Sequence, residues 1–431
     1  MHRRGFRIII QGTLVLSLGI LFSSCGSNAP QSTLDQPASS TEIPTFSSFT
    51  PSDSGKPRSS LTVWIPPFLS PQNESSAGLM FSERVQEFEE ANPDVSISLR
   101  IKDETGPAGL LASLAATRMA APSALPDIIV LDPTSLGNAV LRDLLLPLDS
   151  LFSPPSVPEW YDHSLPSAYV GDSFYGLPFA SETELFVYKK DKIAETPLNW
   201  AALLSGPVSY LYPAGDKLAK FTIAQYLSQD GTLQNETGEL VLDVRILSDI
   251  LDFYSTSREA GIISLSALQL STGKESWALL RQDAAQSALV PLEAYIREAN
   301  RNTYGAQALP TRDGEGIIMT HTFAWALVTT DAERKTIAVD FLNWLLTPDF
   351  LGPWSHALGM LPATSAALSE WPDSGTRALV NQLIRSAVPL PSTEILNTIG
   401  PLVQLAIEDV LFGRETPEAA AQHAGNTLNN P

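Results

Sequence analysis

The fold is set near the start of the chain by three short apolar runs: LTVWI at residues 61–65, VSISLRI at 95–101 and PDIIVLD at 126–132. Each run has the length and the β-branched content of a buried strand. Between them, residues 80–91 and 110–119 carry apolar side chains at three- and four-residue spacing, which is typical of helices. This alternation of strands and helices predicts right-handed crossovers and a largely parallel sheet.

Two side chains near the ends of these strands are candidate ligand contacts. In such sheets small molecules bind beyond the carboxyl ends of the strands, and Trp64 and Asp132 lie near two of those ends. Each has an ordinary structural alternative. Trp64 can be a core residue, since large aromatic side chains dominate cores as well as sites. Asp132 can cap a helix that has Pro133 at its first position.

The segment before the first strand has the pattern of an export signal. Arginines at positions 3, 4 and 7 precede an apolar stretch at 8–22, which is shorter than the roughly 20 residues that span a bilayer as a helix. The Ser23-Ser24-Cys25-Gly26 sequence that follows resembles a bacterial lipobox, although Phe22 stands where Leu is usual. We therefore expect residues 1–24 to be a lipoprotein signal peptide and Cys25, the only cysteine, to carry the lipid.

Residues 25–60 are rich in Ser, Thr and Pro and have no sustained apolar period. Such a segment cannot bury enough apolar surface to offset its ordering entropy, so a disordered tether is expected. The remaining residues, from 61 to 431, exceed what one hydrophobic core usually spans, which predicts two lobes. With a single cysteine, no disulfide within the chain can staple them.

Charge and hydropathy narrow the class of partner. A net charge of -20 and a pI near 4.6 argue against nucleic acid, because phosphate binding needs a basic face. After the signal peptide we find no further apolar run of about 18 residues, so we expect a soluble globular part.

A distinctive segment lies in the middle of the chain, FYGLPFASETELFVYKKD at residues 174–191. Apolar residues flank a polar patch at 181–184, which indicates a strand that crosses between lobes and presents polar groups to a cleft. Glu182 is the candidate ligand contact here, because a carboxylate in an apolar segment needs a partner or a function.

Several segments together resemble family 1 extracellular solute-binding proteins of the maltodextrin-binding type. Two differences stand out: Lys189 replaces the usual Asn, and Ser276-Trp277 replace the usual Ala-Met. The likeness covers nearly all of residues 61–431, in order. It rests on Asn92-Pro93, residues 175–191, TGKESW at 272–277, 304–310, 317–328, 335–346 and GMLPA at 359–363.

The resemblance implies an α/β, two-lobed periplasmic-binding-protein fold of type II, with discontinuous lobes joined by hinge crossings. Lobe one would comprise 61–178 and 311–347, and lobe two 183–305 and 350–431. It further implies the substrate-binding component of an ABC-type importer, which captures a mono- or oligosaccharide in an interlobe cleft without catalysis or cofactor. Such a protein would act outside the cytoplasm as a lipid-anchored monomer that contacts the importer's membrane subunits.

A sugar offers apolar C–H faces, so aromatic side chains near the cleft are further candidates. Trp277 lies beside the Gly273-Lys274 turn, and Trp325 lies just past the expected second crossing at 304–310. For both, the ordinary alternative is a place in the core.

Two other classes of function compete with this interpretation. A carbohydrate-active hydrolase would use paired carboxylates such as Glu182 and Glu184. However, the chain has no Gly-x-Ser-x-Gly elbow, and Ser271 to Lys274 fits Ser-x-x-Lys without its companion motifs. A metal- or polyamine-binding protein of the same fold is the other alternative. The four histidines of the globular part are scattered without ligand spacing, at 163, 321, 356 and 423.

Overall fold

The computed structural model describes residues 59–153, 159–206 and 208–430. The expected signal peptide, Cys25 and the tether up to Arg58 therefore lie outside the described residues. Strand β1 begins at Ser59, slightly before the expected start of the globular part.

The strands form one large sheet and one small one. Seven strands of the large sheet follow the order β2-β1-β3-β10-β6-β8-β7. They are β1 (Ser59–Ile65), β2 (Val95–Ile101), β3 (Ile128–Leu131), β6 (Leu177–Lys189), β7 (Tyr210–Leu211), β8 (Ser287–Pro291) and β10 (Ile318–Leu327). Off this path, β9 (Tyr304–Gln307) and β11 (Leu361–Pro362) pair with β6, and β12 (Ala387–Pro389) pairs with β10. The small sheet pairs β4 (Tyr169–Val170) with β5 (Ser173–Phe174).

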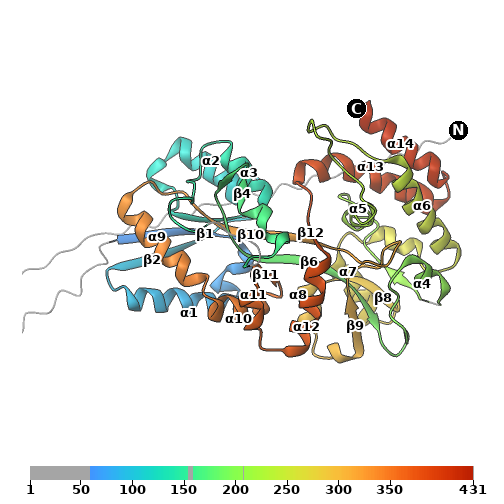
Figure 1. The fold of residues 1–431 in the computed structure, drawn as a ribbon, viewed down its shortest axis with the longest axis horizontal. Helices are drawn as coiled ribbons and strands as arrows, with labels where there is room; N and C mark the ends of the chain where they lie inside the picture. Colours follow the sequence, from blue (N-terminus) through green and yellow to red (C-terminus); the bar gives the residue numbers. More distant parts are fainter. Residues whose placement is uncertain (1–58, 154–158, 207, 431) are drawn as a thin grey trace, which may run out of the picture. The chain divides into compact units, whose positions relative to one another are not determined.

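Helices surround the large sheet (Figure 1). The first group is α1 (Ser76–Ala91), α2 (Leu110–Ala120), α3 (Pro133–Val140), α4 (Trp200–Ser205), α5 (Lys220–Leu227), α6 (Val244–Glu259) and α7 (Gly273–Arg281). The second is α8 (Leu292–Ile296), α9 (Ala332–Leu345), α10 (Pro348–Leu358), α11 (Ser365–Ser369), α12 (Ser374–Leu383), α13 (Thr393–Phe412) and α14 (Pro417–Asn429).

The first three strands pair as the sequence predicts, because β1 lies between β2 and β3 and is parallel to both. The sheet as a whole is mixed, since β10 is antiparallel to β3 and to β6. The expectation of a largely parallel sheet therefore holds for the first three strands. Elsewhere β7 is parallel to β8 and β10 to β12, whereas β6 is antiparallel to each of its partners. β10 returns from a distant part of the chain, and no single crossover helix fixes its direction.

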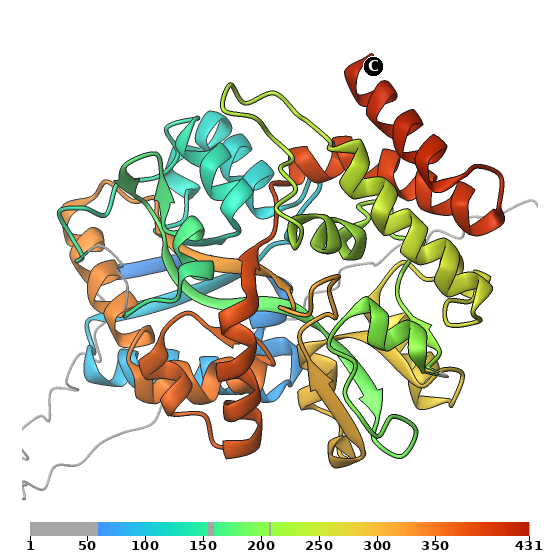
Figure 2. The same ribbon diagram turned by 45° about the vertical axis from the view of Figure 1, so that its right-hand side comes forward.

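Strand β6 belongs to both halves of the molecule. Its first part, Leu177 to Thr183, pairs with β10. Its second part pairs with β8 from Glu184 to Tyr188 and with β9 from Phe186 to Lys189. The same strand thus passes from the half that contains α1 and α9 to the half that contains α7 and β8 (Figure 2). This confirms that residues 174–191 contain a crossing strand.

Each half has a hydrophobic core on both faces of its part of the sheet. In the first half, Val63, Val130 and Trp325 pack with α1, α9 and α10, whereas Trp64 and Leu131 pack on the side of α2 and α3. Because successive strand residues point to opposite faces, this division follows from the sequence register. The strands are buried on both faces, as expected of parallel strands covered by helices.

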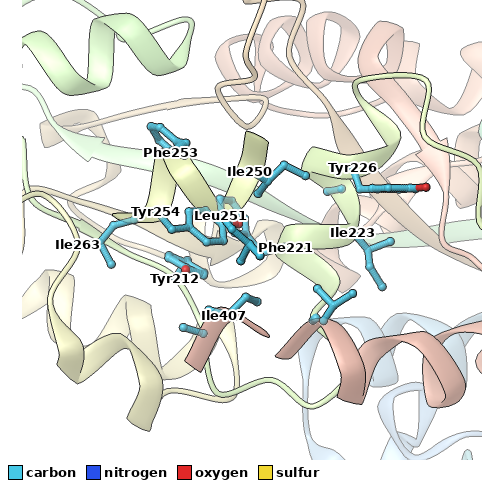
Figure 3. Packing of buried hydrophobic residues seen from close by; sticks show 14 of the residues in the cluster. Tyr212, Phe221, Ile223, Tyr226, Ile250, Leu251, Phe253, Tyr254, Ile263 and Ile407 are labelled. Carbon is cyan, nitrogen blue, oxygen red and sulfur yellow. The ribbon is translucent and has the colours of Figure 1, made fainter. Parts of the chain in front are cut away.

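The second half has a large aromatic core beneath α5 and α6. Tyr212, Phe221 and Tyr254 lie together in it, with Leu251 from α6 and Ile407 from α13 (Figure 3). The Tyr212 and Phe221 ring centroids are 4.5 Å apart, and the Tyr212 and Tyr254 centroids are 5.3 Å apart. This core supports one wall of the cavity described below, because Phe221 belongs to both.

The packing differs from the expected lobe boundaries at two places. The segment at 304–310 contains β9, which pairs with the second part of β6, so β10 makes the other crossing. Helix α10, expected in lobe two, places Phe350, Leu351 and Trp354 in the core of the first half. We therefore propose that lobe one includes α10 and begins its second segment within β10.

Helix α13 differs from the expectation that no further long apolar run exists. By length and composition it could cross a membrane. Its Leu396, Ile399 and Val403 are buried in the core of the second half, and α13 packs against α6 and α14. The apolar composition of α13 is thus accounted for by packing within this core.

Candidate functional site

A cavity of about 540 Å³ lies where β6 and β10 pass between the two halves. The first half contributes Phe68 and Glu104, together with Leu358 and Met360 at the end of α10. The crossing strands contribute residues of β6 and β10, and the second half contributes the remaining residues. Its polar and aromatic lining includes Phe68, Glu104, Glu182, Thr183, Glu184, Lys220, Phe221, Thr272, Lys274, Glu293, Arg297 and His321. The volume falls within the roughly 300–1,000 Å³ of small-molecule sites.

The crossing strands place Glu182 directly opposite His321. The two residues are cross-strand partners in the antiparallel β6–β10 pair, and both line the cavity. Burial lowers the pKa of His321. The charge of Asp132 opposes this lowering and the charge of Lys220 adds to it. The His321 imidazole is therefore neutral near pH 7. A neutral imidazole has one donor and one acceptor nitrogen, which suits a hydroxyl-bearing ligand.

The Glu182 side chain points into the cavity, where the cavity walls shield its carboxyl group from bulk solvent. Loss of solvation raises the pKa of its carboxyl to about 7, and the charges of Glu104 and Glu293 add to this, while Lys274 and Lys220 oppose it. At neutral pH the group is therefore divided between its neutral and ionised forms. The neutral form donates one hydrogen bond and accepts others, whereas the ionised form only accepts.

Glu184 lies deeper, beneath the first turn of α7. Its carboxyl group lies against the backbone of Gly273, where an added Cβ would stand 2.3 Å from Oε1 of Glu184. Burial raises the pKa of Glu184, while Lys220 and the nearby N–H of Gly273 counteract that rise. Helix α7 is otherwise capped by its own residues. The Thr272 side chain accepts from the N–H of Glu275 at 3.3 Å, and the Glu275 carboxylate accepts from the N–H of Thr272 at 3.0 Å.

The cations of the cavity are not equivalent. Glu293 forms ion pairs with both Lys274, at 3.4 Å, and Arg297. Lys220, at the start of α5, forms no ion pair within the described ranges and acts electrostatically on Glu182 and Glu184. Inside the cavity one cation thus faces Glu104, Glu182 and Glu184, which makes the lining net acidic.

Apolar faces complete the lining. Phe68, half-buried in a short 3-10 turn after β1, packs against Phe323 with ring centroids 4.8 Å apart. Phe221 borders the cavity from the other half. Aromatic faces from both halves, together with carboxylates and an imidazole, form a site that can bind a small molecule by stacking and hydrogen bonding.

Of the residues predicted from the sequence, Glu182 lines this cavity. Trp325 does not, because it is fully buried against Phe81 and Phe179 in the core of the first half. Trp64 is also buried and lies on the α2–α3 face of the sheet, with the Lys102 ammonium 5.1 Å from its ring centroid. Both occupy the core positions given as their structural alternative.

Asp132 and Trp277 lie near the cavity but outside its lining. Asp132 caps α3, since its Oδ1 accepts from the N–H groups of Thr134 at 3.0 Å and Ser135 at 3.1 Å. Trp277 packs edge-on against Tyr304 and borders a second, smaller groove between α7 and α8. That groove shares Lys274, Glu293 and Arg297 with the cavity.

Sequence reasoning missed Phe68, Glu104, Lys220 and His321. Phe68 and Glu104 follow the first two strands within a few residues, so the rule about strand carboxyl ends would have found them. His321 could be found only through its register with Glu182, which the sequence does not give. Lys220 begins a helix that is buried on most sides and has no distinguishing pattern.

A metal centre was one of the alternatives considered from the sequence. Over the described ranges, no group of three or more His, Cys, Asp or Glu side chains is arranged to hold a metal ion.

Comparison with known proteins gives one family match. Residues 83–377 match the model of a family described as bacterial extracellular solute-binding protein. Among curated proteins, the sn-glycerol-3-phosphate-binding periplasmic protein UgpB of Escherichia coli strain K12 is 28% identical over 159 residues, and UgpB of Shigella flexneri gives the same values. These matches cover 31% of this chain and 35% of the relative, so the chain spans about a third of the curated relatives' length.

Solved structures are similar over most of the chain. Maltose-bound MalE3 of T. maritima matches with a TM-score of 0.67 at 14% identity, over 86% of this chain and 99% of that one. A cyclic alpha-maltosyl-1,6-maltose binding protein from Arthrobacter globiformis matches with a TM-score of 0.69 at 19% identity, over 86% and 98%. The ABC substrate-binding protein Lmo0181 from Listeria monocytogenes, in complex with cycloalternan, gives 0.64 at 16% identity, over 86% and 98%. At these identities the likeness concerns the fold.

Proposed function

The chain belongs to the bacterial extracellular solute-binding proteins, and from this membership we propose that it captures a carbohydrate for an ABC importer. The periplasmic-binding-protein fold expected from the sequence is confirmed by the structural matches. Family membership also favours binding over the hydrolase alternative, although Glu182 has the raised pKa that glycosidases use. The proposed ligand site is the cavity at the crossing strands.

The observation that carries the proposal is the mixed lining of this cavity. Phe68 and Phe221 offer aromatic faces to the C–H faces of a sugar ring, while Glu104, Glu182 and His321 offer hydrogen-bonding groups to its hydroxyls. Several of the similar solved structures contain an oligosaccharide or are named for one, which supports this class of ligand.

The charge balance of the lining argues against a phosphate-bearing ligand such as the one for which UgpB is named. Lys274 and Arg297 are occupied by Glu293, and Lys220 faces three other carboxylates. A phosphate would therefore meet more negative than positive charge. A neutral polyhydroxyl ligand avoids this repulsion, and a polyamine remains the competing ligand of the same fold.

A thermal-shift screen tests the proposal. Maltose or maltotriose should raise the unfolding temperature, because a ligand that binds only the native state stabilises it by about 2.7 kcal/mol at 100 times its Kd. sn-Glycerol 3-phosphate, spermidine and zinc should not. If one of these three compounds stabilised the protein and no sugar did, that compound would take the place of carbohydrate as the proposed ligand. If the protein released shortened sugars from maltotriose, the hydrolase alternative would be favoured instead.

A matched pair of variants locates the site. Phe68→Ala removes an aromatic face from the cavity and should weaken maltotriose binding by about 1–2 kcal/mol. Phe412→Ala, at an exposed phenylalanine of α13, should leave the affinity unchanged. Equal affinity of the two variants would exclude Phe68 from the site.

We also propose that Cys25 is lipidated and holds the protein at a membrane beside the importer. The arginine-flanked apolar segment and the lipobox-like sequence support this anchor. Metabolic labelling with a radioactive fatty acid should mark the wild-type protein and not Cys25→Ser. Equal labelling of both would exclude Cys25 as the attachment point.

A further inference from the structure

Gly273, the first residue of α7, lies against the Glu184 carboxylate. A Cβ built on Gly273 would stand 2.3 Å from Oε1 of Glu184, far closer than real Cβ contacts, and 3.0 Å from Cδ of Pro291. The backbone φ of Gly273 is not in the left-handed region, so its conformation does not require glycine. Glycine is favoured at this position because the Glu184 side chain fills the space that a Cβ would need.

The first turn of α7 is held from two sides. The capping box satisfies the N–H groups of Thr272 and Glu275 from within the helix. The Glu184 carboxyl group comes from strand β6 and lies against Gly273, whose N–H lowers its pKa. A carboxylate at the start of a helix also interacts favourably with the helix dipole. This contact therefore joins the first turn of α7 to the crossing strand.

The position of Glu184 makes this contact relevant to the cavity. Glu184 follows Glu182 and Thr183 on β6 and pairs with Pro291 of β8. On the other side of the contact, Thr272 and Lys274 line the cavity and flank Gly273. Glu184 thus connects the polar part of the crossing strand with the rim formed by α7.

We propose that Glu184 is a positioning residue, which acts through Gly273 to fix the first turn of α7 and the ligand-facing groups beside it. The effect on affinity rests on the proposed function, whereas the effect on the helix does not. Without this contact the capping box still holds α7 together, but the turn is no longer fixed against β6. Its position relative to the cavity must then be fixed when the ligand binds, and that ordering weakens affinity.

Four variants and a control test this role. Gly273→Ala drives a methyl group into the carboxylate, Glu184→Ala removes the carboxylate, and the double variant combines both. Glu184→Gln keeps an oxygen that can accept from Gly273. Gly137→Ala is the control, because Gly137 is also helical, in α3, and has no atom within 4 Å of an added Cβ.

Hydrogen exchange of ligand-free protein is the first measurement. Glu184→Ala should speed exchange of the amides at 272–276, while Glu184→Gln and Gly137→Ala should retain wild-type protection there. Unchanged protection in Glu184→Ala would overturn the proposal. This result does not depend on the identity of the ligand.

Maltotriose affinity, measured by calorimetry, is the second. Gly273→Ala and Glu184→Ala should each weaken binding about tenfold, the effect of losing one favourable contact with a charged group. The double variant should be no weaker than the worse single variant, because the methyl group then occupies the vacated space. Losses that multiply would show that the two residues act separately and would overturn the proposal. If wild-type protein does not bind maltotriose, the sugar assignment fails and hydrogen exchange alone decides the role of Glu184.

Discussion

The Glu182 carboxyl makes the molecule sensitive to pH. Its pKa is raised to about 7 in the folded protein, whereas an unfolded chain has the ordinary value of about 4.3. Between these values the folded state holds a proton that the unfolded state has released. The stability contributed by this group is therefore complete below the lower value and is lost as the pH rises through the upper one.

Glu182→Gln should remove that loss. From pH 5 to pH 8 the variant should lose about 1 kcal/mol less stability than wild type. This value is smaller than the full pKa shift implies, because solvent in the cavity screens the carboxyl group. Urea unfolding at both values measures the difference, and Glu83→Gln, at an exposed site on α1, is the control. Glu104 and His321 are present in both proteins, so the difference between variants reports the titration of Glu182 together with its coupling to Glu104. An identical pH dependence in wild type and Glu182→Gln would contradict this prediction.

The fate of the predicted site residues has a physical reason. Glu182 was found because a carboxylate interrupts an apolar strand, and such a group has to face a cavity or a partner. Trp64 and Trp325 lie on strands that helices cover on both faces, so an aromatic residue on these strands is in the core whichever face it points to. The sequence shows the aromatic side chain but does not show whether its face of the strand is covered.

At the scale of secondary-structure elements, α3 provides a test of Asp132. Asp132→Ala removes the N-cap and should lower the free energy of unfolding by about 1 kcal/mol, while Asp132→Ser should restore most of it. Maltotriose affinity should be unchanged in both. Thr416→Ala, which removes the N-cap of the distant α14, should show the same stability loss. If Asp132→Ser recovers stability but not affinity, Asp132 contacts the ligand after all.

Elements with strong local patterns were predicted well. Strands β1 to β3 and β6 follow the expected runs, and α1 and α2 overlap the helices expected from apolar spacing at 80–91 and 110–119. The prediction of a crossing at 304–310 was wrong, because the residues of a strand do not show which other strand it pairs with. β9 and β10 follow each other closely in the chain, and their pairing with different parts of β6 shows which of them makes the crossing.

For the whole molecule, the shared strands predict one unfolding transition. Leu342 and Leu251 are fully buried in the first and second cores, and replacing either by Ala should cost about 2–5 kcal/mol. Because β6 and β10 belong to both halves, both variants should shift the same transition in urea. Tryptophan fluorescence and circular dichroism should coincide. Two resolved transitions, each moved by only one variant, would show that the halves unfold independently.

The order of the strands also governs what happens while the chain is being made. The edge of β3 stays open until β10 is complete at Leu327, and the second core lacks α13 and α14 until the last residues emerge. Neither half can complete its core before these elements are synthesised. Until then the unpaired edge of β3 can pair with strands of other chains. A growing chain that has not yet reached β10 and α13 therefore lacks part of each core, and we expect it to expose apolar surface of the kind that chaperones bind.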